Sequence, residues 1–410
     1  MTTSPATGSI RRVLSHDNFR FFIIGDGISL VGNWVQRVAI GWLTWELTHS
    51  GAWLGIIAFC DLFPSLIFSP LGGAIADRFD RLRVAIISQA AAMLQAIALV
   101  FFTGLGLIDI WGLVALTVLR GAIASINQPV RLAMLPSLVP REDLSAAIAL
   151  NSVLFNTARS IGPAVAGVAI VQGGVVAAFT VNTLSFLALL YALMRIRIPR
   201  AMGDGKERAN IFRQAWAGYH YVVGHPGIGP ILFLLMLAAM FARPVSELLP
   251  GFAAGIFSQG ADGLAWMTSV MGVGAMAGGM WFLRYGTHLR RTALAAHALA
   301  IMGGALVVFT SLSNFWLTLP FLALISFSTT VNNISIQSLV QNAVDGAMRG
   351  RVMSIYGMIF RGGPAIGALV MGGLSESFGL RLPIAAGGVV CLAAWLWAAK
   401  RQHALAQSLK

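Results

Sequence analysis

Charged residues are scarce in this chain of 410 residues, because Asp, Glu, Lys and Arg together make up only 10% of it. A soluble globular domain usually carries about 25% charged residues. Hydrophobic residues reach 57%, and a water-soluble fold of that composition would expose large apolar patches and aggregate. The shortage of charge therefore excludes an ordinary soluble domain and predicts a protein whose surface faces lipid.

Signatures of site chemistry are also missing. The two cysteines, Cys60 and Cys391, lie in apolar segments without metal-ligand or disulfide spacing, and the seven histidines show no ligand spacing. The chain has no Walker loop, catalytic triad or paired-carboxylate signature. We therefore expect no cofactor, no metal, no ATP-driven step and no enzymatic activity. Residues 1–18 are polar and lack an apolar core, which predicts a cytoplasmic tail rather than a signal peptide.

Long apolar runs are what the sequence does contain. Stretches such as 84–105 and 175–194 hold the roughly 20 residues that a helix needs to cross about 30 Å of hydrocarbon. Their polarity does not alternate as it does in barrel strands. The runs predict an all-α membrane protein with twelve transmembrane helices, near 19–46, 52–76, 84–105, 109–133, 144–170, 173–194, 227–255, 262–284, 291–312, 315–340, 351–374 and 380–400.

The positions of the basic residues predict how the chain crosses the membrane. The formal net charge is +13, which in a soluble protein would indicate nucleic acid. Here 22 of the 28 Lys and Arg residues fall on the side of the two termini, Arg381 falls on the other side, and five lie within spans. This asymmetry predicts that both termini are cytoplasmic and gives no reason to expect a nucleic-acid partner. Tryptophans at 34, 42, 45 and 53 read as an interfacial belt.

The chain appears as two similar halves. Gly162-Pro163-Ala164-Val165-Ala166-Gly167 matches Gly363-Pro364-Ala365-Ile366-Gly367, and the stretch 72–78 matches 278–284. Such a repeat predicts two six-helix bundles with the substrate site between them near the midplane. The expected segments are a tail at 1–18, bundles at 19–194 and 227–400, a cytoplasmic linker at 195–226 with a surface helix over 211–223, and a tail at 401–410.

The loop after the second span carries a motif, Gly73-x-x-x-Asp77-Arg78-x-Asp80-Arg81-x-Arg83. It resembles the signature loop of the major facilitator superfamily, which implies the fold of that superfamily. Glycine permits close helix contact, and an acid at a helix end can dock on the positive N-terminus of a neighbouring helix. We expect a cytoplasmic gate in which Asp77 meets the start of the eleventh span. Arg349 and Arg351 would assist there, and Arg284 would lie near Glu142 or Asp143.

Two further motifs concern the direction of transport. Gly162-Pro163-x-x-x-Gly167 in the fifth span resembles the antiporter motif of the superfamily and favours export over import; the alternative is a packed seam of small residues, which is compatible with both. Arg120 resembles the fourth-helix arginine that is linked to proton coupling in exporters; a structural role is the alternative. Segments such as Asn18-Phe19-Arg20-Phe21 and 349–354, Arg-Gly-Arg-Val-Met-Ser, resemble the bacterial branch of the enterobactin exporter and related secretion and drug-efflux proteins.

Ionisable residues inside the spans are the remaining candidates, because a bare charge in hydrocarbon is costly and is retained for function. The acids are Asp26, Asp61 and Glu247. Asp26 is the expected proton carrier, with a helix-packing hydrogen bond as the alternative. Asp61 could pair with Arg37, and Glu247 could neutralise Arg243 one turn away. The proton-coupling and cavity set comprises Asp26, Arg37, Asp61, Arg120, Arg159, Arg243, Glu247 and Arg361.

These features predict a proton-coupled exporter of small amphipathic organic molecules such as drugs or siderophores. It would work by alternating access as a monomer in the bacterial inner membrane, with protons, substrate and lipid as its partners. The alternatives are an uncoupled facilitator or importer of a lipid or metabolite, and a membrane enzyme or signalling protein on a transporter fold.

Overall fold

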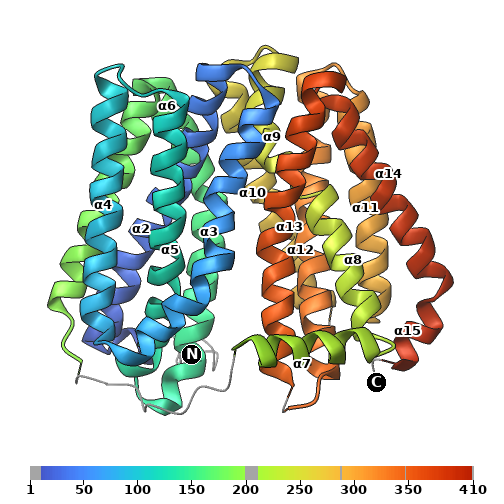
Figure 1. The fold of residues 1–410 in the computed structure, drawn as a ribbon, viewed down its shortest axis with the longest axis horizontal. Helices are drawn as coiled ribbons and strands as arrows, with labels where there is room; N and C mark the ends of the chain where they lie inside the picture. Colours follow the sequence, from blue (N-terminus) through green and yellow to red (C-terminus); the bar gives the residue numbers. More distant parts are fainter. Residues whose placement is uncertain (1–10, 199–210, 287–288, 347, 409–410) are drawn as a thin grey trace, which may run out of the picture. The chain divides into compact units, whose positions relative to one another are not determined.

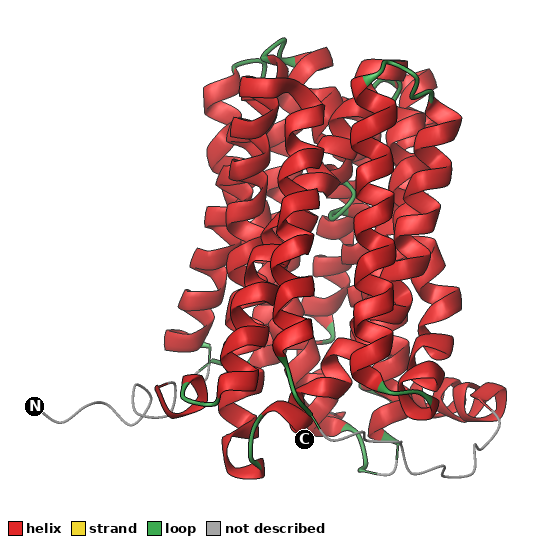
Figure 2. Cartoon of the chain, turned by 90° about the vertical axis from the view of Figure 1, so that its left-hand side faces the viewer, coloured by secondary structure: helices red, strands yellow, loops and turns green. Residues whose placement is uncertain are grey.

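The computed structural model describes residues 11–198, 211–286, 289–346 and 348–408, except for the side chains of 66, 69–74, 76, 77, 211–215, 403 and 406. These residues form helices joined by short connections, with no strand among them (Figure 2). Eight helices in this part of the chain are long and apolar enough to cross a membrane. The expectation of an all-α, multi-pass membrane protein is therefore confirmed.

The chain divides into two compact units. Unit 1 comprises 1–47 and 63–206, and unit 2 comprises 48–62 and 207–410. Unit 1 contains α2 (Asp17–Thr48), the second half of α3 (Gly51–Arg78), α4 (Arg81–Gly104), α5 (Ile110–Leu138), the 3-10 turn η1 (Arg141–Asp143) and α6 (Leu144–Arg195) (Figure 1). The first half of α3 groups with unit 2.

Unit 2 contains the remaining helices. They are α7 (Ile211–Gly224), α8 (Ile228–Phe241), α9 (Val245–Gly251), the π-helical turn η2 (Phe252–Ile256), α10 (Gly260–Tyr285), α11 (Arg291–Ser311), α12 (Phe315–Ala343), α13 (Arg349–Phe378), α14 (Arg381–Lys400) and α15 (Gln402–Ser408).

The helix α6 covers two of the expected spans. Its backbone leaves the helical region at Gly173 (φ −148°, ψ 21°) and Gly174 (φ 66°, ψ −172°). The positive φ at Gly174 is a conformation that glycine adopts without steric penalty. The tight reversal therefore falls where the sequence places the boundary between the spans at 144–170 and 173–194.

The expected helix over 227–255 is interrupted. α8 ends at Phe241, α9 begins at Val245, and the five residues of η2 are π-helical. Pro244 in the gap has no N–H to donate to the carbonyl one turn earlier, so the α-helical ladder breaks there. The carbonyl of Met240 at this break lies against Gly367 of α13, where a Cβ would overlap it. Irregular backbone within a membrane helix is tolerated where protein covers it.

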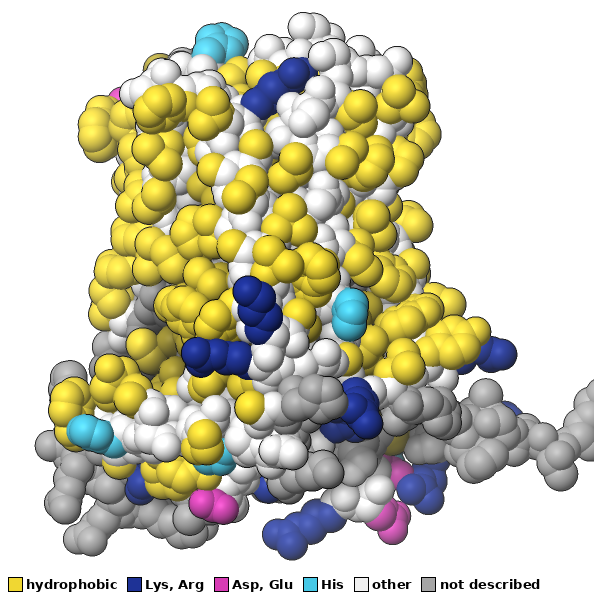
Figure 3. All heavy atoms as spheres, turned by 90° about the vertical axis from the view of Figure 1, so that its right-hand side faces the viewer, with side chains coloured by type: hydrophobic (Ala, Val, Ile, Leu, Met, Phe, Trp, Pro, Cys, Tyr) yellow, Lys and Arg dark blue, Asp and Glu magenta, His cyan; other side chains and the backbone are white. Residues whose placement is uncertain are grey.

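The surface helix expected over 211–223 is seen as α7, which runs across the ends of the unit 2 helices (Figure 1). Gly218 lies against Arg351 of α13, and the hydroxyl of Tyr221 donates to the carboxylate of Asp345 at 3.0 Å. Trp216 and Tyr219 are exposed and stacked at 5.8 Å. Figure 3 shows the face on the side of α14, where hydrophobic side chains cover the middle and most charged ones lie near the end that carries α7.

Candidate functional site

A buried ion pair lies inside unit 1. Asp26 of α2 pairs with Arg131 of α5, and the two side chains are only 2% and 16% exposed. Arg131 counted as a cytoplasmic-side charge in the sequence, because the fourth span was expected to end near residue 133. α5 continues to Leu138, so Arg131 lies within the helix and turns toward Asp26. The expected proton carrier is thus buried, as predicted, but with a partner that the sequence did not identify.

A network of buried amides lies on the same face of α2. Gln36 donates to Gln95 of α4 at 3.0 Å and accepts a hydrogen bond from Asn182 of α6. About two turns closer to Asp26, Gln89 of α4 donates to Ser29 at 3.4 Å. The oxygen of Gln89 accepts from Asn127 of α5 at 3.2 Å, and Asn127 precedes Arg131 by one turn. These bonds fix four helices around the ion pair, because an unpaired amide in hydrocarbon is costly.

Guanidinium and aromatic side chains form a second cluster, on α2 and the first half of α6. The Arg37 guanidinium lies 5.5 Å from the centre of the Trp34 ring, and Trp34 meets Phe155 edge-on at 6.4 Å. Arg159 follows Phe155 by one turn and is partly buried. Trp34 lies roughly 20 Å from the end of α2 by helical rise, which places it far from the expected interfacial belt.

Glycine explains how α2 and α6 come so close. A Cβ on Gly162 would overlap that of Trp34, and one on Gly27 would press on Leu154. Pro163 and Gly167, the other fixed residues of the expected antiporter motif, are buried in the same helix. The motif therefore forms a packed seam in unit 1, which is compatible with export and with import, and its link to antiport stays a prediction.

In unit 2 the interrupted helix presents its own arginine. Arg243, in the gap between α8 and α9, donates to the carbonyl of Phe360 at 2.6 Å and lies 4.2 Å from the centre of that ring. Tyr356 stacks on Phe360 at 5.9 Å. Glu247 of α9 accepts from Ser246 at 3.3 Å, while Arg361 is exposed on α13 and Asp61 is half-buried in α3. Arg120 is likewise half-buried, in α5.

The start of α3 packs tightly on the end of α13, within unit 2. A Cβ on Gly55 would overlap the carbonyl of Ala368, and one on Gly372 would overlap that of Gly51. Glu376 of α13 accepts from the hydroxyl of Ser50 at 2.6 Å and from the Ala52 amide at 3.1 Å. An acid thus occupies the positive N-terminus of α3. From the sequence, such a contact was expected only between Asp77 and the start of the eleventh span.

The residues of the signature loop have distinct local roles. Asp80 is the N-cap of α4, accepting from the amides of Leu82 and Arg83 at 3.0 and 3.3 Å. Arg81 donates to the carbonyl of Ala133 at 3.0 Å, Arg83 lies 3.8 Å from Asp80, and Arg78 is exposed. The loop ties α4 to α5. The environment of Gly73 and the side chain of Asp77 lie outside what the structure describes.

The other expected gate residues lie in unit 2. Arg284 donates to the hydroxyl of Tyr285 at 3.2 Å, and Arg351 lies 3.2 Å from the sulfur of Met348. Arg349 is exposed at the start of α13. The expected contact at Ala347 lies outside the described residues, and the clasp between Asp77 and α13 remains a prediction.

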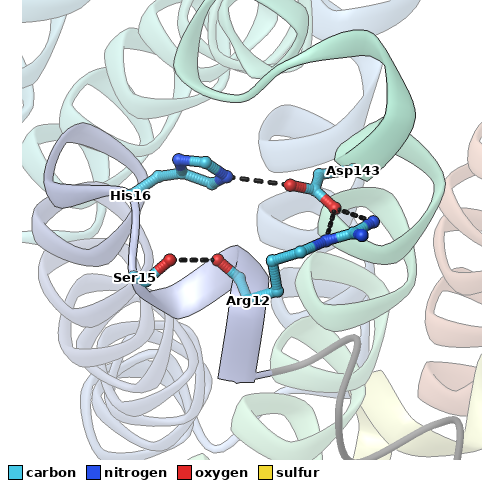
Figure 4. Close-up of polar contacts among 4 residues, drawn as sticks. All are labelled: Arg12, Ser15, His16 and Asp143. Atoms are coloured by element: carbon cyan, nitrogen blue, oxygen red, sulfur yellow. Dashed lines mark hydrogen bonds and ion pairs between the residues drawn. The ribbon is translucent and has the colours of Figure 1, made fainter.

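Asp143 takes part in a clasp that the sequence did not reveal. It is 1% exposed and accepts from Arg12 Nε at 2.6 Å, while His16 Nε2 lies 2.8 Å from its other oxygen (Figure 4). The hydrogen bond to His16, with the bonds and charge of Arg12, holds the pKa of Asp143 below its usual value. Val13 is fully buried beside it. The segment expected to be a free tail is therefore packed on unit 1 from residue 11 onward.

Comparison with solved structures identifies proteins of the same fold. The fold matches solved membrane transporters, including a bacterial homologue of the lysosomal transporter Spinster in an inward-facing conformation (TM-score 0.71, 13% identity, 96% of this chain and 97% of that one). A bacterial homologue of the iron transporter ferroportin matches with a TM-score of 0.70, 16% identity, and coverage of 94% and 99%. These similarities show that the chain has the fold of these transporters.

The family follows from the sequence as a whole. A family model described as transmembrane secretion effector matches residues 10–407, and the chain belongs to that family. Its relatives include a staphyloferrin A transporter of Staphylococcus aureus (27% identical, 88% of this chain and 90% of that one) and an enterobactin exporter of Shigella boydii (25%, 88% and 86%). A macrolide efflux protein of Streptococcus pyogenes is 22% identical, over 91% and 94%. The expected superfamily and branch are confirmed, and family and relatives alike are transport proteins rather than enzymes.

Proposed function

We propose that the chain is a secondary active exporter that moves a small amphipathic organic molecule out of the cell in exchange for protons. The observation that carries this proposal is the buried pair Asp26–Arg131. Once Asp26 takes a proton, it no longer neutralises Arg131, and an uncompensated buried charge is strongly unfavourable. Proton binding then favours a conformation in which Arg131 reaches water or another anion. That linkage converts a proton gradient into a conformational change.

The relatives support export of small organic molecules, since their names refer to siderophore transport, siderophore export and macrolide efflux. We propose twelve spans in two six-helix bundles, 19–194 and 227–400, joined by the linker 195–226. Both termini would be cytoplasmic in the bacterial inner membrane, and the protein would act as a monomer. Arg120 would couple the proton on Asp26 to the substrate, which would bind between the bundles by alternating access.

Asp77 and its arginines would form the cytoplasmic gate by docking at the start of α13, whose first amides lack intrahelical partners. Glu376 of α13 meets the start of α3 in a similar way. This contact between an acid and a helix N-terminus supports the proposed docking of Asp77. Asp77→Asn should raise the accessibility of cysteines placed in the cavity to reagents added from the cytoplasmic side. Leu283→Ala, at the repeated position without an acid, should raise it less.

Everted membrane vesicles test the proposal, with staphyloferrin A, enterobactin and a macrolide as probes. Export appears as uptake of at least one probe when the vesicle interior is acidified, and Asp26→Asn should abolish that uptake while sparing exchange between labelled and unlabelled probe. Wild-type uptake that persists after an ionophore collapses the gradient would instead identify an uncoupled facilitator. Gradient-driven uptake by Asp26→Asn at the wild-type rate would exclude Asp26 as the proton carrier.

A further inference from the structure

Arginines outnumber acids inside the membrane-spanning helices. Six arginines lie there, namely Arg37, Arg120, Arg131, Arg159, Arg243 and Arg361, against the three acids Asp26, Asp61 and Glu247. A guanidinium is costly in hydrocarbon and therefore faces water, an acid or a ligand of opposite charge. The charge balance thus favours an organic anion as substrate and opposes a cation.

Arg159 is the arginine of this set whose surroundings point to a ligand. Among the residues that the structure describes, its guanidinium has no acidic partner and no hydrogen bond. It lies roughly 22 Å into α6, near the middle of the first half of that helix. Five N–H donors in a planar fork match the two oxygens of a carboxylate. A partly accessible arginine at this depth, with its donors unused by the protein, is suited to the acidic group of a ligand.

The surroundings of Arg159 suit a flat apolar group next to that acid. Phe155, one turn before Arg159, is 36% exposed and meets Trp34 edge-on. Arg37 lies over the other part of the cluster, against the Trp34 ring. Because Gly162 holds α2 against α6, the two guanidinium groups and the two rings are carried on helices that cannot easily separate. Aromatic faces bind planar rings by stacking or edge-on contact.

We propose that Arg159, with Arg37, Trp34 and Phe155, forms the site that recognises an organic acid, in which a carboxylate or an equivalent pair of acidic oxygens adjoins a flat ring. This inference rests on the proposed transport function and names the substrate class. A cationic amphiphile of the same shape would meet the guanidinium of Arg159 and would be repelled.

Binding to purified protein in lipid nanodiscs tests the charge preference without any gradient. The probes are 1-naphthoate and 1-naphthylmethylammonium, which carry the same ring and opposite charges, followed by calorimetry against empty nanodiscs. Naphthoate should bind and the ammonium should not. Arg159→Gln should weaken naphthoate binding about 10- to 100-fold, as expected for losing hydrogen bonds to a charged group, and Arg159→Lys should recover part of it. Arg20→Gln is the matched control, since it removes an exposed charge from the same unit.

A second variant separates ring recognition from folding. Phe155→Leu should weaken the binding of naphthoate but not that of hexanoate, which has the acid and no ring. Equal binding of the two naphthyl probes, binding of neither, or equal effects of Arg159→Gln and Arg20→Gln would overturn the proposal. Gradient-driven export of an organic cation but no organic anion would also overturn it, while leaving proton-coupled export itself intact. Loss of gradient dependence with naphthoate binding unchanged would do the reverse.

Discussion

The two units repeat the same sequence motifs, yet their interiors differ. Unit 1 buries five amide side chains and two acids, whereas the described part of unit 2 buries one amide, Asn332, and no acidic or basic side chain. In unit 1 the amides form two sets of hydrogen bonds, one linking Gln36 with Gln95 and Asn182 and the other linking Gln89 with Asn127, one turn from Arg131. In unit 2 Asn332 donates only to the carbonyl of Ala295, at 2.9 Å.

Unit 2 relies instead on close backbone approach. Gly274 and Gly278 of α10 lie against the backbone of α12 at Ala323 and Phe327, where a Cβ would overlap carbonyl oxygens. Small residues that let helices approach are the main means of packing in a bilayer, where burying apolar surface supplies no driving force between helices. The difference shows that, among the described residues, buried amides and acids are concentrated in unit 1, while close backbone contacts recur in unit 2.

Removing the acid of the ion pair should have the largest effect. Asp26→Asn leaves Arg131 buried without a counter-charge, so the free energy of unfolding should fall by about 3–5 kcal/mol. The double variant Asp26→Asn/Arg131→Gln should regain most of that stability and still lack gradient-driven transport. Thermal unfolding in detergent and vesicle uptake measure the two effects. A single variant as stable as the wild type would show that the pair does not distinguish unit 1 energetically.

Filling the close contact between Gly55 of α3 and the backbone of α13 should have the next largest effect. Gly55→Ala places a Cβ on the carbonyl of Ala368, and because backbone cannot move aside cheaply we expect a loss of about 1–3 kcal/mol. Gly373→Ala, in α13 with nothing within 4 Å of its added Cβ, is the matched control and should be neutral or slightly stabilising. Equal midpoints of thermal unfolding for the two variants would mean that this contact is looser than its geometry indicates.

Features that depend on neighbouring residues could be predicted from the sequence, whereas contacts between residues far apart in the sequence could not. Apolar runs of span length, and the Gly173–Gly174 break between two of them, are local properties, and helices were expected where they occur. Pro244 indicates an interruption, although a single helix was expected over 227–255. Asp26 could be singled out because charge is rare in a span, but its partner could not, because Arg131 lies far away in sequence and near an uncertain helix end. The hydrogen bonds among the amides could not be predicted, because single Gln and Asn residues carry no spacing signal that indicates their partners.

Cutting the amide network should affect unit 1 more than the equivalent change affects unit 2. Gln36→Leu leaves Gln95 and Asn182 without their bonds to Gln36, and each unsatisfied buried amide costs about 1–3 kcal/mol. Asn332→Leu frees only the carbonyl of Ala295, so its cost should lie at the lower end of that range. The difference in unfolding midpoint between the two variants measures the contrast directly. Equal losses would remove it.

The smallest effect is expected at the clasp of Asp143, where the polar character of unit 1 continues to the N-terminal segment. The pKa of Asp143 is lowered in the folded protein, chiefly by the hydrogen bond to His16 and then by Arg12. A carboxyl with a lowered pKa stabilises the fold above its unfolded value, about 3.9, and that contribution is lost as the pH falls through the folded value. The carboxyl of Asp143 should therefore stay ionised from pH 5 to 8, so its own titration should not release residues 11–16 in that range.

Asp143→Asn should release this segment at every pH in that range, which hydrogen exchange of the Val13 and His16 amides would detect as faster exchange. Glu142→Gln is the matched control, because Glu142 is the exposed neighbouring acid, and it should leave exchange unchanged. Since Arg12 is 57% exposed, solvent screens part of the pairing, and the midpoint of global unfolding should hardly move. A large shift in that midpoint would instead make the clasp part of the folding core of unit 1 and deepen the contrast with unit 2.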